Sequence, residues 1–302
     1  GGGGFMTINV DGEPAFLDFR ERAPAHAQRD LYLDEGGNFQ QRMSIVGGKA
    51  SGVPGTVKGM WAAHQRYGSL PWKRLLQPAT VLAEGGFIVP RALAEMAAEK
   101  IVEDDGETNF HKYFANMRAG ELFTQPELAV TLGLIAEDAQ SFYSGLPARQ
   151  LVAQMQASGG LISLQDLAGY RAVWREPIRE AWRDMEVLSA PPPSSGGFAL
   201  VQLLKLRDFA DTHFRQLWHN EPRYVHLLAE LEKRVFADRA EYLGDPDFVD
   251  VPLQALLSDR YLQGRAAQVN PKAISEGADV RPGLESTDTT HFSVLDGQGN
   301  AV

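Results

Sequence analysis

Hydrophobic and polar residues alternate near the N-terminus of the chain, as they do in a β-strand. Residues 5–10, FMTINV, follow this period of two, and a second short extended stretch lies beyond the dipeptide Asp11-Gly12. Alternation on both sides of Asp-Gly is typical of a β-hairpin. The pattern therefore predicts two short strands joined by a turn at Asp11-Gly12.

From residue 56 to about residue 170, apolar residues recur at three- and four-residue spacing, which is typical of helices with one buried face. Gly52, Pro54 and Gly55 mark a tight loop before this region, and Thr56 is a candidate cap for the first helix. Several of the segments end in glycine, a common helix stop. This part of the chain is therefore predicted to be mainly helical.

The pattern changes again after residue 170. The pattern of residues 174–190 predicts strands. A rigid run of three prolines follows at residues 191–193, and the sequence Ser194-Ser195-Gly196-Gly197 comes next. Residues 198–210 and 222–244 have the spacing of strong amphipathic helices. The order of elements therefore places strands before the prolines and helices after them.

The last part of the chain returns to short elements. Residues 245–258 predict a turn-rich connection with one short helix, and residues 290–302 predict a strand, a glycine-rich turn and the start of another strand. Because this hairpin stops after its turn and the chain opens at GGGGF without Met, we expect both ends of the natural protein to lie outside these residues.

Composition narrows the class of protein. The 302 residues, 44% hydrophobic and 23% charged, are ordinary for one large or two average soluble globular domains. The net charge of −10 repels nucleic acid and anionic membranes. The absence of cysteine excludes disulfide scaffolds, thiolate zinc sites and cysteine nucleophiles. No apolar run approaches the roughly 20 residues that span a bilayer.

Common catalytic and metal-binding sequence motifs do not explain the function of this chain. It has no GxxxxGK[ST], HExxH or GxSxG sequence. His226 and Glu230 are four residues apart on a predicted helix, a pair more typical of an ordinary contact than of a metal site. Asp245, Asp247 and Asp250 lack the spacing of an EF-hand and indicate a solvated or arginine-paired loop. No metal ion is therefore predicted.

Small hydroxylated residues gather just before the last predicted strand, in Ser286-Thr287-Asp288-Thr289-Thr290. A surface loop explains this composition, and so does a cleavage site. If the bond before Thr289 is cut, the new α-amino group, with a pKa of about 7.7–8.0, lies beside the hydroxyl that it must activate. Nucleophile and base then come from one residue, and the following strand holds it rigidly.

Seven stretches of the chain together resemble the γ-glutamyltranspeptidase family, and the resemblance runs from Gly1 to Val302. They are long, ordered and irregular, so the match is specific. In chain order they read GGGGF, LDFRERAPA, ASGVPGTVKG, GGLISLQDLAGYRA, PPPSSGG, EKRVFADRAEYLGDPDFVDVP and ESTDTTHFSVLDGQGNAV.

The resemblance implies an N-terminal-nucleophile hydrolase, made as a precursor that cuts itself before the first threonine of a TTH motif. Here the cut falls between Asp288 and Thr289, with Thr289 as the nucleophile. The implied fold is an α+β, four-layer α/β/β/α sandwich, incomplete in this chain. Residues 1–288 correspond to the large subunit without its N-terminal section, and residues 289–302 to the beginning of the small subunit.

The resemblance also assigns a substrate ligand. The arginine of the family's DFRE motif binds the α-carboxylate of the glutamyl group, and that position is Arg20. A guanidinium is always charged, and its fork matches a carboxylate in two hydrogen bonds. For Arg20 alone, a salt bridge to Asp18 or Glu21 is the competing interpretation. Thr290 is expected beside the nucleophile and His291 in a structural role. Ser194 and Ser195 are expected mainly in a rigid loop, with lining of the site as the alternative.

The implied reaction is attack of Thr289 on the γ-amide of glutathione or a related γ-glutamyl compound, without metal or organic cofactor. Water, an amino acid or a peptide then accepts the glutamyl group, and the small subunit is the expected partner. The family's oxyanion-hole glycines lie further downstream, so residues 1–302 alone are expected to be inactive. Bacterial family members imply a periplasmic or extracellular location.

Two rival functions stay open at this stage. A cephalosporin acylase of the same superfamily uses the same nucleophile on a glutaryl side chain, which has a carboxylate but no α-amino group. A non-catalytic homologue that binds glutamyl compounds or assists assembly is the other rival. Thr289 and Arg20 argue against the non-catalytic interpretation, and DFRE favours γ-glutamyl recognition.

Overall fold

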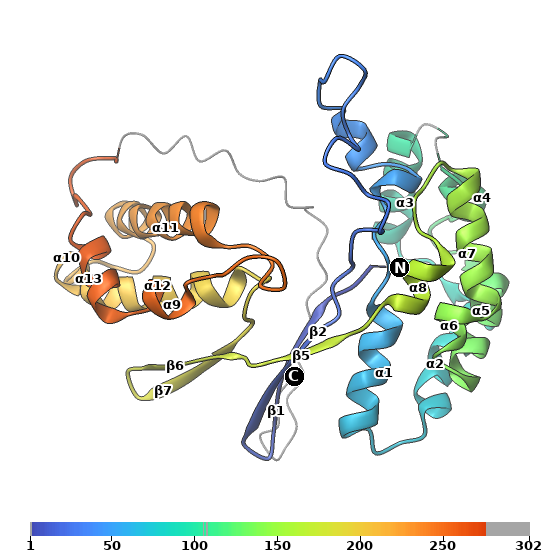
Figure 1. The fold of residues 1–302 in the computed structure, drawn as a ribbon, viewed down its shortest axis with the longest axis horizontal. Coiled ribbons are helices and arrows are strands. Elements are labelled where there is room, and N and C mark those ends of the chain that lie inside the picture. The colour runs from blue at the N-terminus through green and yellow to red at the C-terminus, as the bar shows by residue number, and fades with distance from the viewer. Residues whose placement is uncertain (1, 105, 107, 276–302) are drawn as a thin grey trace. The chain divides into compact units, whose positions relative to one another are not determined.

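The computed structural model describes residues 2–104, 106 and 108–275 (Figure 1). The chain forms two compact units. The first comprises Gly1–Gly4 and Asp18–Val173, and the second comprises Phe5–Leu17 and Trp174–Val302. The expected boundary between residues 288 and 289 lies outside the described residues. Each unit is described by itself below.

The first unit is mainly helical, as the spacing of its apolar residues predicts. Its helices are α1 (Thr56–Tyr67), α2 (Trp72–Gly85), α3 (Arg91–Asp104), α4 (Phe110–Phe114), α5 (Pro126–Glu137), α6 (Ser141–Ser144), α7 (Leu146–Ala157) and α8 (Leu164–Gly169). Two short 3₁₀ turns, η1 (Gln41–Ser44) and η2 (Gly48–Ala50), precede α1, and the two-residue strands β3 (Phe87–Ile88) and β4 (Leu122–Phe123) pair antiparallel.

One local expectation in this unit is wrong. Thr56 does not cap α1: it is the first residue of the helix, and Gly55 occupies the N-cap position without a side-chain cap. The hydroxyl of Thr56 instead donates a hydrogen bond to the carbonyl of Gly2 at 3.2 Å. A contact with the N-terminal segment therefore takes the place of a local one.

The predicted N-terminal hairpin is confirmed. Strand β1 (Phe5–Val10) and strand β2 (Glu13–Asp18) are joined by Asp11 and Gly12, whose φ angles are 54° and 79°. Positive φ at both central residues is the geometry that favours Asp-Gly in two-residue turns. β2 lies between β1 and β5 (Val173–Arg175), and its last four residues are buried. The strand that leads to Arg20 is thus firmly packed.

The second unit packs helices against a hairpin. Strands β6 (Ile178–Trp182) and β7 (Met185–Ser189) pair antiparallel, and α9 (Gly196–Phe209) packs on both of them (Figure 1). The chain continues through α10 (Asp211–Phe214), α11 (Pro222–Tyr242), α12 (Leu253–Leu256) and α13 (Asp259–Ala266). The strands predicted before the prolines and the helices predicted after them are therefore confirmed.

The core of this unit lies between α9, α11 and α13. Its fully buried large side chains include Phe198, Leu206, Leu227, Leu231 and Leu262. Removing such side chains from water supplies the main stabilising free energy, on the order of 1.5–3 kcal/mol each. Among the described residues, no helix combines the length and apolar character needed to cross a bilayer.

Helix α11 also buries charge next to this core. The carboxylate of Glu230 is 1% exposed and accepts hydrogen bonds from Nζ of Lys233 at 2.6 Å and from Nη1 of Arg234 at 3.1 Å. It also accepts from the backbone N–H of Ser275 at 3.1 Å and from the Ser275 hydroxyl. Glu230 therefore belongs to an ionic network, as its ordinary-contact interpretation predicts. Across the described part of the chain, no group of three or more His, Asp or Glu residues could hold a metal ion.

Candidate active site

Arg20 belongs to the first unit and comes two residues after the end of β2, and hydrogen bonds hold the backbone on both sides of it. Phe19 exchanges two backbone hydrogen bonds with Gly4, at 3.2 and 2.9 Å. Arg22 exchanges two with Val53, at 3.2 and 2.7 Å. Two neighbouring strand-like pairings therefore bracket the two-residue segment that carries Arg20.

The peptide groups of Arg20 itself are also hydrogen-bonded. Its N–H donates to Oδ1 of Asp18 at 3.1 Å, and its carbonyl accepts from the hydroxyl of Tyr170 at 2.8 Å. Both partners are buried: Asp18 is 6% exposed and Tyr170 is 3% exposed. The backbone is thus fixed from two directions, while the side chain of Arg20 is 53% exposed.

The side chain of Glu21 is one neighbour of the Arg20 guanidinium. Nε of Arg20 is 3.9 Å from Oε1 of Glu21, whose side chain is 43% exposed. An exposed ion pair of this kind contributes about 0–1 kcal/mol. Asp18 was the other expected partner, and one of its oxygens accepts from the Arg20 backbone. The pair with Glu21 by itself therefore offers a carboxylate from solvent little competition for the guanidinium.

Two glycines permit the close backbone packing around this arginine. A Cβ at Gly3 would lie 2.3 Å from the nitrogen of Glu21 and 2.4 Å from the carbonyl oxygen of Phe19. A Cβ at Gly55 would lie 2.0 Å from that same oxygen and 2.1 Å from the hydroxyl of Tyr170. The glycine-rich start of the chain and the ASGVPG loop therefore both lie against the DFRE segment.

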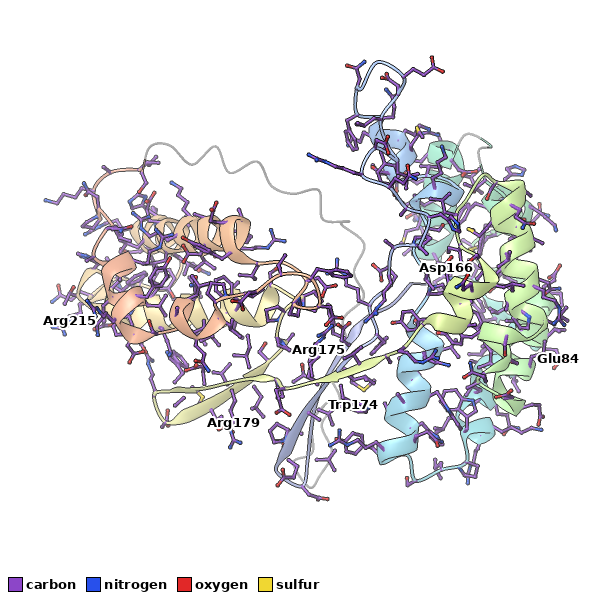
Figure 2. The ribbon with its side chains drawn as sticks, viewed as in Figure 1. Glu84, Asp166, Trp174, Arg175, Arg179 and Arg215 are labelled. Carbon is purple, nitrogen blue, oxygen red and sulfur yellow. The ribbon has the colours of Figure 1, made fainter. Side chains whose placement is uncertain are left out.

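Helix α8 supplies the long-range contacts to the segment. It begins with a capping box, in which Ser163 and Asp166 exchange hydrogen bonds between side chain and backbone. Asp166 is labelled on this helix in Figure 2, and its second oxygen accepts from the backbone N–H of Ala25 at 2.9 Å. Although burial acts to raise it, the pKa of Asp166 is lowered overall by the hydrogen bonds from Ser163 and Ala25. Asp166 and Tyr170 thus attach one short helix to the arginine segment at two points.

Tyr170 belongs to a small hydrophobic core of the first unit. Its ring stacks on that of Tyr143, with centroids 6.0 Å apart and planes inclined by 14°. The hydroxyl of Tyr143 donates to the carbonyl of Pro54 at 3.0 Å and accepts from the N–H of Lys58 at 3.0 Å. Burial raises the pKa of Tyr143 to about 12, against a small opposing effect of the Lys58 N–H. Burial, followed by the neighbouring Tyr143, also raises the pKa of Tyr170, so its hydroxyl stays protonated.

Ser194 and Ser195 lie at the start of α9 in the second unit. The hydroxyl of Ser194 accepts from the N–H of Gly196 at 3.3 Å, and that of Ser195 accepts from Nε of Arg239 at 2.9 Å. A Cβ at Gly197 would lie 2.3 Å from the carbonyl oxygen of Ala190, so the helix start is packed tightly on the end of β7. The local structure agrees with a rigid loop, and participation of the serines in catalysis stays a prediction.

The acidic loop after α11 is paired with arginine. Arg175, labelled in Figure 2, lies at the end of β5. It donates to both carboxylate oxygens of Asp247, at 2.9 and 3.1 Å. The N–H of Asp247 in turn donates to Oδ1 of Asp245 at 2.9 Å. This confirms the arginine-paired interpretation. A cavity of about 420 Å³ lies beside the loop and is lined by Pro192, Pro246, Phe248, Val249, Asp250, Val251 and Leu253.

The other predicted site residues, Asp288, Thr289, Thr290 and His291, lie outside the described residues. Arg20 and the serine pair belong to different units. Within the first unit, the structure joins Arg20 to Tyr170 and Ala25 to Asp166, and sequence reasoning missed the roles of Tyr170 and Asp166. The motif GGLISLQDLAGYRA was recognised, but nothing in it signals which of its side chains reaches the DFRE segment.

Comparison with known proteins identifies the family. A sequence profile described as gamma-glutamyltranspeptidase matches residues 1–302. The chain belongs to the γ-glutamyltranspeptidase family. A glutathione hydrolase proenzyme of Pseudomonas aeruginosa is 53% identical over 303 residues, which cover all of this chain and 54% of that relative. An acylase ACY 1 proenzyme of Pseudomonas sp. strain SE83 is 37% identical over 317 residues, covering all of this chain and 56% of the relative.

A solved structure shows the same fold. The γ-glutamyltranspeptidase of Pseudomonas nitroreducens superposes with a TM-score of 0.90 and 50% identity, over 94% of this chain and 85% of that one. This confirms the expected α+β fold class of the N-terminal-nucleophile hydrolases. The chain spans about half the length of the curated relatives that it matches.

Proposed function

We propose that this γ-glutamyltranspeptidase family chain forms part of an enzyme that transfers the γ-glutamyl group of glutathione and related amides. The observation that carries the proposal is the 53% identity with a glutathione hydrolase proenzyme over the whole chain. The exposed guanidinium of Arg20 on a rigid backbone supports it, because such a group suits recognition of a substrate carboxylate.

The proposed enzyme first cleaves its own precursor. The hydroxyl of Thr289 attacks the carbonyl carbon of Asp288, and the peptide nitrogen leaves as the new α-amino group of Thr289. The resulting ester is hydrolysed by water, which leaves a carboxylic acid on Asp288 and a hydroxyl on Thr289. Residues 1–288 then belong to the large subunit, which ends at Asp288. The small subunit begins at Thr289 and is the partner of the large one.

The same hydroxyl then performs the transfer. The α-amino group of Thr289 accepts the proton as the hydroxyl oxygen attacks the γ-carbonyl carbon of the donor. The C–N bond of the donor breaks, and the leaving amine takes up the proton. Water or the amine of an amino acid or peptide then attacks the γ-glutamyl ester, releasing glutamate or a new γ-glutamyl amide. The proposal assigns both steps to the hydroxyl and α-amino groups of Thr289 and includes no metal or organic cofactor.

The remaining site residues have supporting roles in the proposal. Arg20 binds the α-carboxylate of the donor through paired hydrogen bonds. Thr290 stands beside the nucleophile, and His291 serves the structure around it. Ser194 and Ser195 keep the loop before α9 rigid. We also propose export to the periplasm or the extracellular space, as in bacterial members of the family.

A glutaryl acylase is the second candidate, because the chain is 37% identical to an acylase proenzyme. The two functions differ in the donor. A γ-glutamyl amide carries an α-amino group and an α-carboxylate, whereas a glutaryl amide carries only the carboxylate. Comparing kcat/KM for γ-glutamyl and glutaryl anilides separates them, and a preference for the glutaryl compound would favour the acylase.

The decisive experiment uses the full-length protein beside a Thr289→Ala control. N-terminal sequencing of the bands on a denaturing gel should find a small band beginning Thr-Thr-His-Phe in the natural protein and none in the control. One intact band in both would refute Thr289 as the self-cleaving nucleophile and would favour a non-catalytic glutamyl-binding homologue.

A further inference from the structure

The strongest unassigned relationship in the first unit joins two motifs that are 150 residues apart in the chain. The hydroxyl of Tyr170 donates to the carbonyl oxygen of Arg20 at 2.8 Å. Tyr170 belongs to the segment GGLISLQDLAGYRA, whereas Arg20 belongs to LDFRERAPA. The contact therefore couples helix α8 to the peptide that carries the proposed substrate ligand.

The surroundings of Tyr170 leave its hydroxyl little freedom. The ring is buried and stacked on Tyr143, and Gly55 approaches the hydroxyl so closely that a Cβ there would lie 2.1 Å away. Since burial keeps the phenol protonated, it remains a donor throughout the neutral pH range. The Tyr170 hydroxyl thus meets the Arg20 carbonyl at a fixed position.

A rigid carbonyl matters because a guanidinium binds a carboxylate best when its two N–H groups lie in the carboxylate plane. Rotation of the Arg20 peptide would turn the Cα–Cβ bond and carry the guanidinium away from that geometry. The N–H of Arg20 is held by Asp18, but that bond fixes only the peptide group before the Cα and not the following one, which contains the Arg20 carbonyl. The hydroxyl of Tyr170 supplies the second point of attachment.

We propose that Tyr170 is a positioning residue for substrate binding, which orients Arg20 toward the α-carboxylate of the γ-glutamyl donor through its hydrogen bond to the Arg20 carbonyl. This inference rests on the proposed function of Arg20. It assigns Tyr170 no contact with the substrate and no part in the bond-making steps.

The first test compares Tyr170→Phe with the natural full-length, processed enzyme, using γ-glutamyl anilide as donor. The variant keeps the ring and removes the donor. KM for the donor should rise about 3- to 10-fold, the range of one lost hydrogen bond, while kcat changes less. Tyr32→Phe is the matched control, because the hydroxyl of Tyr32 also donates to a backbone carbonyl of the same unit, that of Lys49 at 3.0 Å.

A donor without the α-carboxylate isolates the proposed cause. For 4-aminobutanoyl anilide, which lacks that group, kcat/KM should be the same in Tyr170→Phe and in the natural enzyme. A merely structural defect would lower the rate with both donors. An unchanged KM for γ-glutamyl anilide, or equal losses with the two donors, would overturn the inference.

A double-mutant cycle with Arg20→Ala separates this inference from the proposed function. If Tyr170 acts through Arg20, the double variant should be no worse than Arg20→Ala alone. Independent, additive losses would refute the positioning role while leaving Arg20 in place. If Arg20→Ala has the natural KM, the proposed carboxylate ligand itself is wrong, whatever Tyr170 does.

A second variant keeps the inference testable if Tyr170→Phe yields too little folded protein. Asp166→Asn weakens the other attachment of α8 to the same segment, at Ala25, together with the capping box at the start of the helix, and keeps the ring and hydroxyl of Tyr170. It should raise KM for γ-glutamyl anilide less than the loss of the Tyr170 hydroxyl does, again without effect on 4-aminobutanoyl anilide. Two results together would refute positioning by α8. Asp166→Asn would have the natural KM, and any Tyr170 variant that folds would bind γ-glutamyl anilide as the natural enzyme does.

Discussion

Nε of Arg239 donates a hydrogen bond to the hydroxyl of Ser195 at 2.9 Å, so helix α11 holds the loop that precedes helix α9. The contact spans 44 residues of the chain and occupies a hydroxyl that the sequence leaves open to a catalytic role. Ser194, by contrast, accepts a hydrogen bond from the N–H of Gly196, two residues away. The two serines of PPPSSGG therefore have different structural partners.

Ser195→Ala should lower the stability of the protein more than its catalytic efficiency. Losing the bond to Arg239 should cost about 0.5–1.5 kcal/mol in the free energy of unfolding. The kcat/KM of the full-length enzyme should fall less than tenfold, which is about 1.4 kcal/mol. Urea unfolding and steady-state kinetics measure both, with Ser194→Ala as the control. A loss of 10²–10³-fold in kcat, about that of an oxyanion donor, would instead show that Ser195 touches the reacting atoms.

Glu230 should make the second unit sensitive to acid. Although burial acts to raise it, hydrogen bonds from Lys233, Ser275 and Arg234 lower the pKa of Glu230 from 4.5 to about 2. A lowered pKa stabilises the folded state fully above about pH 4.5, and this contribution is lost as the pH falls toward 2. Its size is on the order of 3 kcal/mol. Thermal unfolding followed between pH 6 and pH 2 should show the loss.

The variant Glu230→Gln tests the assignment. It should lower stability at neutral pH by roughly 3 kcal/mol, because Arg234 is left buried without its carboxylate. It should also flatten the acid dependence. Glu95→Gln is the matched control, since its pair with Arg91 is exposed and should matter little. An unchanged acid profile in Glu230→Gln would assign the acid sensitivity to other groups.

Gly3→Ala should disturb the arginine segment, because the new Cβ would lie 2.3 Å from the nitrogen of Glu21. Backbone must move to relieve this contact. We expect a lower melting temperature and a higher KM for γ-glutamyl anilide in the full-length enzyme. Gly133→Ala in α5 is the control: its Cβ meets nothing within 4 Å, and alanine should stabilise the helix by about 1 kcal/mol. Equal behaviour of the two variants would contradict the packing argument.

Arg175→Lys should loosen the acidic loop although it keeps the charge. Lysine cannot reproduce the two parallel hydrogen bonds to Asp247, and the side chain of Arg175 is only 13% exposed. We expect a loss of about 1–3 kcal/mol and faster proteolytic cleavage within residues 244–252. Arg91→Lys should behave like the natural protein, because the side chain of Arg91 is 87% exposed. Cleavage at the natural rate in Arg175→Lys would show that the pair does not hold the loop.

Local sequence determined most of the secondary structure. Asp11-Gly12 predicts its turn because both residues accept positive φ, and the spacing of apolar residues predicts α9 and α11 because each helix buries one face. Thr56 is the exception. Its hydroxyl bonds to Gly2, more than 50 residues away, and this contact took precedence over the local cap. A propensity for capping cannot anticipate such a competitor.

The sequence by itself determined the family, Arg20 as the candidate carboxylate ligand and Thr289 as the candidate nucleophile, because long irregular motifs carry that information directly. Only the tertiary structure decided how Arg20 is held. Tyr170, Asp166 and Gly3 act through contacts with residues far away in the chain, and no local pattern of hydrophobicity or charge encodes such a partner. Packing of two distant segments places the hydroxyl of Tyr170 at the Arg20 carbonyl, and that geometry exists only in the folded chain.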